Sequence, residues 1–137
     1  MYLLSITTPE KVVFEDQISS LIAPGMAGYL EILTDHAPII TSLMPGKLTV
    51  TDNNKEKIIY AVSGGFLEVS GNRATLLADA VEVASQIDLK RAEAALERAG
   101  RRVESKAREI DIPRAVAALR RAENRIKICG EYASQPV

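Results

Sequence analysis

Two stretches near the C-terminal end of the sequence nearly repeat each other: IDLKRAEAALERAGRRV at Ile87–Val103 and IDIPRAVAALRRAENRI at Ile110–Ile126. Aligned at an offset of 23 residues, they are identical at ten of 17 positions. In each copy, apolar residues recur at steps of three and four, which places them along one side of an α-helix. The pattern therefore predicts two amphipathic helices. Their apolar stripes are Leu89, Ala92, Leu96, Ala99 and Val103 in the first copy, and Ile112, Ala115, Leu119, Ala122 and Ile126 in the second.

The residues around the repeat indicate how the two helices begin and connect. Asp88 and Asp111 stand where helix N-caps are expected, and Pro113 is acceptable in a first turn. Only Glu104–Glu109 separates the copies, which leaves room for a tight connection, so we predict an antiparallel helical hairpin over residues 87–137. Its stripes are rich in alanine, and each buried carbon stabilises by only about 0.8 kcal/mol. We therefore hypothesise that this hairpin re-docks or extends.

Upstream of the hairpin, residues 1–86 form a different pattern. Short β-rich runs alternate with turn residues such as Pro24-Gly25, Gly64-Gly65 and Gly71-Asn72. Such strands, spaced about ten residues apart, are typical of an antiparallel sandwich or flattened barrel. The predicted fold is therefore an all-β domain over 1–86 followed by the α-helical hairpin. The runs are Tyr2–Thr7, Val12–Glu15, Ile18–Ala23, Tyr29–Leu33, Lys47–Thr51, Lys57–Val62, Phe66–Val69 and Ala74–Leu77.

Composition and charge narrow the class of protein. The chain has 137 residues, 47% of them hydrophobic, and a formal net charge of −1, which argues against a dedicated nucleic-acid binder. The charge is divided unevenly: residues 1–87 hold five basic and ten acidic side chains, and residues 88–137 hold twelve basic and eight acidic. No apolar run is long enough to cross a bilayer, and the N-terminus lacks the pattern of a signal peptide, so a soluble intracellular protein is expected.

The sequence offers little for catalysis or metal binding. It contains one Cys, one His and none of the common phosphate-loop, dinucleotide or zinc motifs. His36, in a turn-like loop, is more consistent with a structural or capping role than with catalysis. Cys129 is more consistent with a buried or incidental thiol than with a nucleophile. The pair Gly64-Gly65 favours a turn or bulge over a ligand contact. We predict a protein that is not an enzyme.

One set of side chains does suggest a function. Arg91 and Arg98 are two helical turns apart, and Arg121 and Arg125 are one turn apart, so each pair shares a helix face. In an antiparallel hairpin the four guanidinium groups converge and suit phosphate oxygens or carboxylates. The alternative is a solvated basic surface with local pairs such as Glu97–Arg101. The spacing alone favours that alternative.

Three segments carry a resemblance to a known family. GYLEILTDHAP at Gly28–Pro38, SGGFLEV at Ser63–Val69 and the IDxxRA hairpin occur together and in order. In this combination the chain resembles the epsilon subunits of F-type ATP synthases, although Glu31 stands where that family usually has glycine. The resemblance implies a ten-stranded sandwich and a non-catalytic subunit of the central rotor stalk. It also implies peripheral association, through the complex, with the cytoplasmic face of a bacterial plasma membrane, or with the organellar equivalent.

The resemblance also implies partners and a ligand. The expected partners are the gamma subunit, the ring of c subunits, and the alpha and beta subunits of the catalytic hexamer. The extended hairpin would inhibit ATP hydrolysis, and the folded hairpin would bind ATP as a regulatory ligand, with no obligatory cofactor and no metal. The residues that match the family's ATP motif are Glu82, Ile87, Asp88, Arg91, Ala92, Arg98, Arg121 and Arg125. Two other functions stay open: a free-standing adaptor that grips an acidic protein, and a cytosolic ATP sensor.

Overall fold

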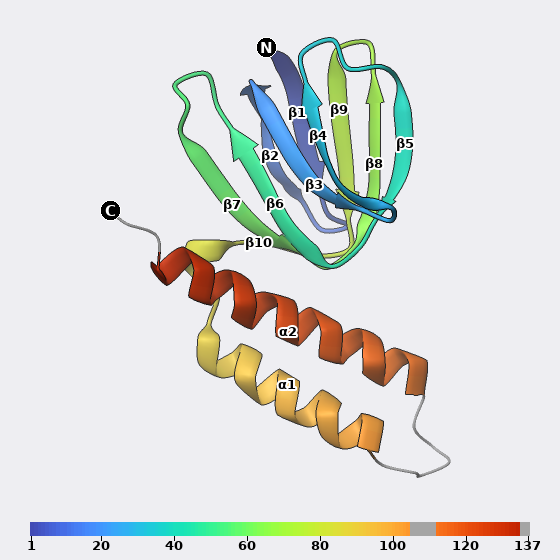
Figure 1. Cartoon of the computed structure of the whole chain (residues 1–137), viewed down its shortest axis with the longest axis vertical. Helices are drawn as coiled ribbons and strands as arrows, with labels where there is room; N and C mark the ends of the chain where they lie inside the picture. Colours follow the sequence, from blue (N-terminus) through green and yellow to red (C-terminus); the bar gives the residue numbers. More distant parts are fainter. Residues whose placement is uncertain (105–111, 135–137) are drawn as a thin grey trace. The chain divides into compact units, whose positions relative to one another are not determined.

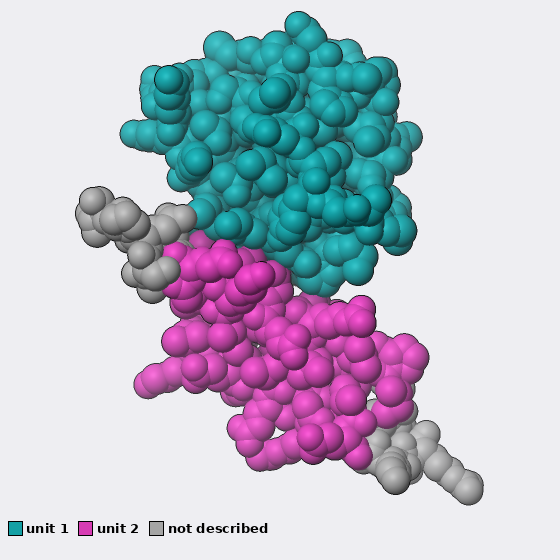
Figure 2. All heavy atoms as spheres, in the orientation of Figure 1, with its two compact units in different colours: residues 1–83 teal, residues 84–137 magenta. Residues whose placement is uncertain are grey.

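The computed structural model describes residues 1–104 and 112–134, and within them it contains ten β-strands, a short 3₁₀ turn and two α-helices (Figure 1). The chain divides into two compact units, Met1–Val83 and Ala84–Val137 (Figure 2). The sequence placed this boundary after residue 86. All the strands belong to the first unit, and both helices belong to the second.

The strands of the first unit form one continuous sheet that curls around a common core (Figure 1). Its order is β10-β7-β6-β3-β5-β8-β9-β1-β2, and β4 pairs with β3 off this path. The strands are β1 (Tyr2–Thr7), β2 (Val12–Ile18), β3 (Ser20–Gly25), β4 (Gly28–Leu33), β5 (Ile39–Leu43), β6 (Gly46–Thr51), β7 (Lys57–Val62), β8 (Gly65–Ser70), β9 (Arg73–Ala78) and β10 (Val81–Val83).

The pairing is antiparallel, as predicted, with one exception. β1 and β9 run parallel, with Leu3 opposite Arg73 and Thr7 opposite Leu77. These two strands are far apart in the sequence, so no hairpin constrains their relative direction. Two strands that the pattern of β-rich runs did not predict are β5, which begins just after Pro38, and β10, which is three residues long.

The core follows the alternation of side chains along the strands. In β1, Tyr2, Leu4 and Ile6 are buried, while the residues between them are partly exposed. The buried Tyr2 hydroxyl donates a hydrogen bond of 2.5 Å to the carbonyl oxygen of Ile32 in β4. Burial of the phenol, and then the nearby charge of Glu31, raise the pKa of Tyr2 far above its ordinary value of 10.0.

A glycine at the start of β8 is required by close backbone approach. Gly65 has a φ of +141°, and a Cβ atom built there would lie 2.0 Å from the carbonyl oxygen of Leu77 in β9. Gly64, with a φ of +127°, precedes it at the turn. Gly64 and Gly65 therefore allow β8 to approach β9 closely. This supports the interpretation, made from the sequence, that they form a turn or bulge.

The second unit is the predicted helical hairpin. It consists of the 3₁₀ turn η1 (Ala84–Gln86), α1 (Leu89–Glu104) and α2 (Ile112–Ser134), and the two helices pack antiparallel (Figure 1). Four alanines of the predicted stripes are buried: Ala92, Ala99, Ala115 and Ala122. The first residue of each stripe is instead exposed, Leu89 at 42% and Ile112 at 40%, because it lies at the helix end.

Candidate functional site

The first IDxxRA motif builds the start of α1. The carboxylate Oδ1 of Asp88 accepts a hydrogen bond of 3.1 Å from the backbone N–H of Arg91, and the carbonyl oxygen of Asp88 accepts one of 3.0 Å from Ala92. Asp88 is thus the N-cap that the sequence predicted. Ile87 and Ala92 are buried beside it. Asp111, the cap predicted for the second helix, lies outside the described residues.

Three arginines of α1 lie on one side of its apolar stripe. Arg91, Arg98 and Arg102 are exposed, and each immediately precedes a residue of the apolar stripe: Ala92, Ala99 or Val103. One residue corresponds to about 100° of rotation around a helix, so all three guanidinium groups extend from the same flank. Of these three, the family motif had named only Arg91 and Arg98.

The same relation holds in α2, because α2 repeats the sequence of α1. Arg114, Arg121 and Arg125 immediately precede Ala115, Ala122 and Ile126 of the second stripe. The repeat makes the antiparallel pair approximately two-fold symmetric about an axis perpendicular to the plane of the hairpin. Rotation about this axis exchanges the two helices but keeps each face of the hairpin on the same side. The arginine-bearing flank of α1 and that of α2 therefore lie on the same side of the hairpin. We call these six residues the arginine face: Arg91, Arg98, Arg102, Arg114, Arg121 and Arg125.

Two members of the arginine face, Arg102 and Arg114, were missed in the prediction of a site from the sequence. The information needed to find them was present, because the 23-residue offset that relates the helices also relates Arg91 to Arg114 and Arg125 to Arg102. The family motif contains only one member of each of these two related pairs, Arg91 and Arg125.

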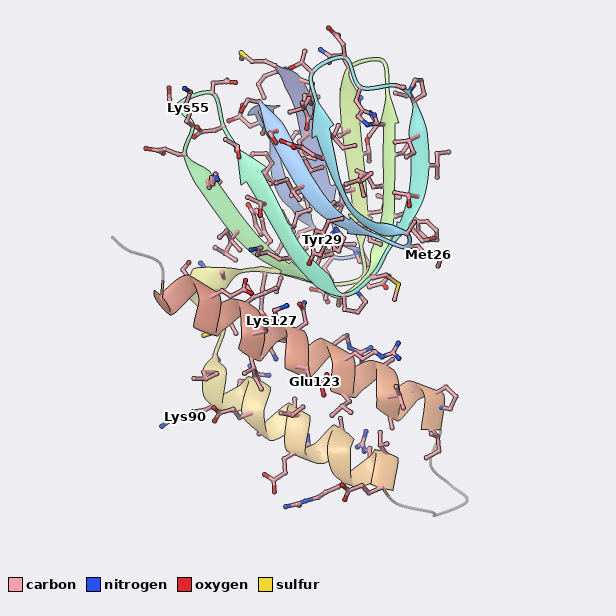
Figure 3. The ribbon with its side chains drawn as sticks, viewed as in Figure 1. Met26, Tyr29, Lys55, Lys90, Glu123 and Lys127 are labelled. Carbon is pink, nitrogen blue, oxygen red and sulfur yellow. The ribbon has the colours of Figure 1, made fainter. Side chains whose placement is uncertain are left out.

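The helix glutamates are kept away from the arginine face, whereas Asp88 immediately precedes Leu89 and caps the first turn beside Arg91. Among the described residues, Glu93, Glu97, Glu104 and Glu123 each immediately follow a stripe residue, which places them on the opposite flank. That flank is mixed in charge and also carries Lys90 and Lys127, which Figure 3 labels together with Glu123. Arg101 lies there too and forms an ion pair with Glu97 one turn away.

The arginine face contains like-charge neighbours instead. Arg98 and Arg102 are one turn apart on α1, and Arg121 and Arg125 are one turn apart on α2. The residues three and four positions before Arg98 and Arg121 are alanines, so neither of these two arginines follows a glutamate at that helical spacing. Like charges at this spacing destabilise a helix by about 0.2–0.5 kcal/mol per pair. A bound anion removes this repulsion, and two or more guanidinium groups hold phosphate oxygens well.

Glu82, the remaining residue of the predicted set, lies in the first unit. It is in β10, half-buried and opposite Ala61 of β7. Lys47 of β6 is opposite the same alanine from the other side. Lys47 and Glu82 therefore flank one small, buried side chain, and Glu82 is within reach of a long lysine side chain.

The other residues considered for chemistry have structural surroundings. The Nδ1 atom of His36 is 2.7 Å from the carbonyl oxygen of Ala37, within its loop. Cys129 is a partly buried free thiol on α2. Across residues 1–104 and 112–134, no group of three or more His, Cys, Asp or Glu side chains is arranged to hold a metal ion.

A second feature of the surface is an apolar patch on the first unit. Ile40 of β5, Phe66 of β8 and Leu77 of β9 are exposed at 74%, 58% and 55%. Phe66 pairs with Leu77 of β9 on one side and with Ser42 of β5 on the other. Ile40 is two residues before Ser42 in β5, so its side chain lies on the same face of the sheet as that of Ser42. Near this patch, the backbone N–H of exposed Met26 donates to the carbonyl oxygen of Ser42. Figure 3 shows Met26 and Tyr29 at one end of the sandwich.

Known proteins resemble both units. Residues 1–84 match the family model of the β-sandwich domain of ATP synthase delta/epsilon chains, and residues 85–130 match that of their long α-helix domain. The ATP synthase epsilon chain of Protochlamydia amoebophila is 46% identical over 105 residues, covering 77% of this chain and 71% of its own. That of Desulforamulus reducens is 52% identical over 103 residues, covering 75% and 77%.

A solved structure shows the same fold. A chain in the cryo-EM structure of the Euglena gracilis mitochondrial ATP synthase, described as OSCP/F1/c-ring, aligns with a TM-score of 0.80 at 21% identity. The alignment covers 98% of this chain and 81% of that one.

Proposed function

Since this chain belongs to the ATP synthase delta/epsilon family, as an epsilon chain of the bacterial type, we propose that it is a non-catalytic component of the central stalk, with a hairpin that responds to ATP. Family membership supports the place in the complex. The arginine face supports the response to ATP, because six arginines gather there while the glutamates lie on the opposite flank. This segregation of charge is the single observation that carries the ligand proposal.

In the stalk, the partners we propose for the first unit are the gamma subunit and the ring of c subunits. The apolar patch of Ile40, Phe66 and Leu77 is a surface of the kind that protein interfaces bury, and we assign it to gamma. No helix within residues 1–104 and 112–134 is long and apolar enough to cross a membrane. On the basis of family membership, we propose that the chain associates with the cytoplasmic side of its membrane through the complex.

Co-purification with gamma tests this assignment. Phe66→Asp places a charge in the centre of the patch, and we expect it to reduce recovery of gamma strongly. Leu33→Asp is the matched control, because Leu33 is exposed to a similar extent, 53%, on β4. Equal recovery of gamma with both variants would refute the patch as the interface. If the unmodified chain retained no gamma, a free-standing adaptor or ATP sensor would replace the stalk assignment.

For the hairpin we propose two states. In the extended state it inhibits ATP hydrolysis by entering the catalytic hexamer of alpha and beta subunits, where its arginines meet acidic side chains. In the folded state the arginines hold the phosphates of ATP, Ile87 and Ala92 pack near the adenine, and Asp88 accepts a hydrogen bond from the nucleotide. ATP that binds only one state shifts the population toward it, by about 1.4 kcal/mol at a concentration tenfold above Kd.

Thermal unfolding with and without MgATP tests the nucleotide site. We expect ATP to raise the unfolding temperature of the wild-type chain and to have no effect on the double variant Arg121→Ala, Arg125→Ala. The control is Arg101→Ala with Arg120→Ala, which removes the same number of charges from the opposite flank of the hairpin. An ATP-induced shift that survives in the first double variant would exclude the arginine face as the site.

A further inference from the structure

We infer that the arginine face contains a second phosphate-binding site, formed by Arg98, Arg102 and Arg114 at the end of the hairpin where the two helices connect. This inference extends the proposed ATP site, because it uses the same face. It shares Arg98 with the ATP motif but adds Arg102 and Arg114, which that motif does not include, and it predicts a different number of bound anions.

The internal symmetry of the hairpin places the second site. The 23-residue offset maps Arg91 onto Arg114, Arg98 onto Arg121, and Arg102 onto Arg125. The symmetry extends beyond the arginines, since the buried alanines Ala92 and Ala99 correspond to the buried Ala115 and Ala122. A phosphate site made by Arg91, Arg121 and Arg125 therefore has a counterpart made by Arg114, Arg98 and Arg102.

Each of the two sites has the same parts. One arginine comes from the first turn of a helix: Arg91 is the third residue of α1, and Arg114 is the third residue of α2. The other two are an i,i+4 pair from the partner helix, which runs antiparallel. Each site thus combines three guanidinium groups, one from the first turn of a helix and two from the other helix.

The two sites are too far apart to be a single one. Arg91 and Arg102 are separated by 11 positions, which corresponds to about 16 Å along α1 at 1.5 Å per residue. One triphosphate does not span that length, so each end of the face takes its own anion. The chemical class that fits is a compact polyphosphate, either the phosphate chain of a nucleotide or inorganic tripolyphosphate. A planar guanidinium group binds such oxygens in a bidentate manner.

The number of bound anions tests this inference in the full chain. We expect calorimetric titration with inorganic tripolyphosphate to show two equivalents per wild-type chain. Arg102→Gln with Arg114→Gln should remove one equivalent and leave the other. Arg91→Gln with Arg125→Gln should remove the complementary one. The control Arg101→Gln with Arg120→Gln, on the opposite flank, should retain both, and helical circular dichroism confirms that each variant is folded.

The possible outcomes separate this inference from the proposed ATP site. One equivalent in the wild type, lost with Arg91→Gln and Arg125→Gln but unaffected by Arg102→Gln and Arg114→Gln, would overturn the second site and leave the ATP site intact. Two equivalents that neither double variant changes would overturn both. Titration with MgATP then tells whether the second site accepts a nucleotide or only the bare phosphate chain, and the site stands in either case.

Discussion

Replacing Arg98 and Arg121 by glutamine should stabilise the helical hairpin while it removes the response to ATP. Each substitution eliminates one like-charge pair at i,i+4 spacing, Arg98 with Arg102 and Arg121 with Arg125. Each pair costs the helix about 0.2–0.5 kcal/mol, so the double variant should gain about 0.4–1 kcal/mol. Arg and Gln have similar helix propensities, so the change isolates the charge. For a small unit this gain corresponds to a rise of about 2–8 °C in Tm.

The assay is thermal unfolding followed by helical circular dichroism. The gain should be present at ~0.1 M salt and nearly absent at ~1 M, where the Debye length falls from about 10 Å to about 3 Å. The control Arg101→Gln should have the opposite sign at low salt, a loss of about 0.3–0.5 kcal/mol, because Arg101 pairs with Glu97. If the double variant is destabilised at low salt, or if its gain is unchanged at high salt, the arginines are not in mutual repulsion and our reasoning about the face fails.

Three further predictions concern caps, glycines and a buried phenol. Asp88→Ala should lower the stability of the hairpin by about 1 kcal/mol, and Asp88→Asn much less, in thermal unfolding, because both Asp and Asn cap the N–H of Arg91. Gly65→Ala should destabilise the first unit by more than about 2 kcal/mol in urea, whereas Gly71→Ala, with φ +58° and no neighbouring atom within 4 Å, should cost only about 1 kcal/mol. Equal costs would contradict the close approach of Gly65 to Leu77. Tyr2→Phe should cost about 0.5–1.5 kcal/mol at neutral pH through loss of the bond to Ile32. Because the pKa of Tyr2 is raised above its unfolded value of 10.0, the native state keeps its proton longer, so stability falls as the pH rises above 10 in the wild type. The Phe variant should lack that part of the fall in alkaline urea titrations.

The parts of the fold that depend on local periodicity were predictable from the sequence. The step pattern of Ala92, Ala99, Ala115 and Ala122 predicted the buried seam, and Asp88 predicted the start of α1. The parallel pairing of β1 with β9 was not predictable, because it joins strands from the two ends of the unit and is decided by packing of the whole sheet. The strand β10 was missed because three residues, Val81–Val83, are too few to show an alternation.

The candidate site shows a similar division. Spacing along one helix was enough to place Arg91 with Arg98 and Arg121 with Arg125. The short connection also predicted an antiparallel hairpin in which these four converge, but the spacing alone favoured an ordinary solvated surface over a binding site. In the antiparallel pair, these six arginines each stand one residue before a stripe residue and so share a face, and the glutamates, which follow stripe residues, do not.

The most direct test of the central claim, that the hairpin binds ATP through its arginine face, is a calorimetric titration of the intact chain with MgATP, with MgADP as the control. We predict saturable binding of ATP with a Kd between about 1 µM and 1 mM, equivalent to roughly −8 to −4 kcal/mol, and weaker binding of ADP, which has one phosphate fewer. The absence of any ATP binding at millimolar concentrations would contradict the claim. The arginines would then be a basic surface for the catalytic hexamer alone.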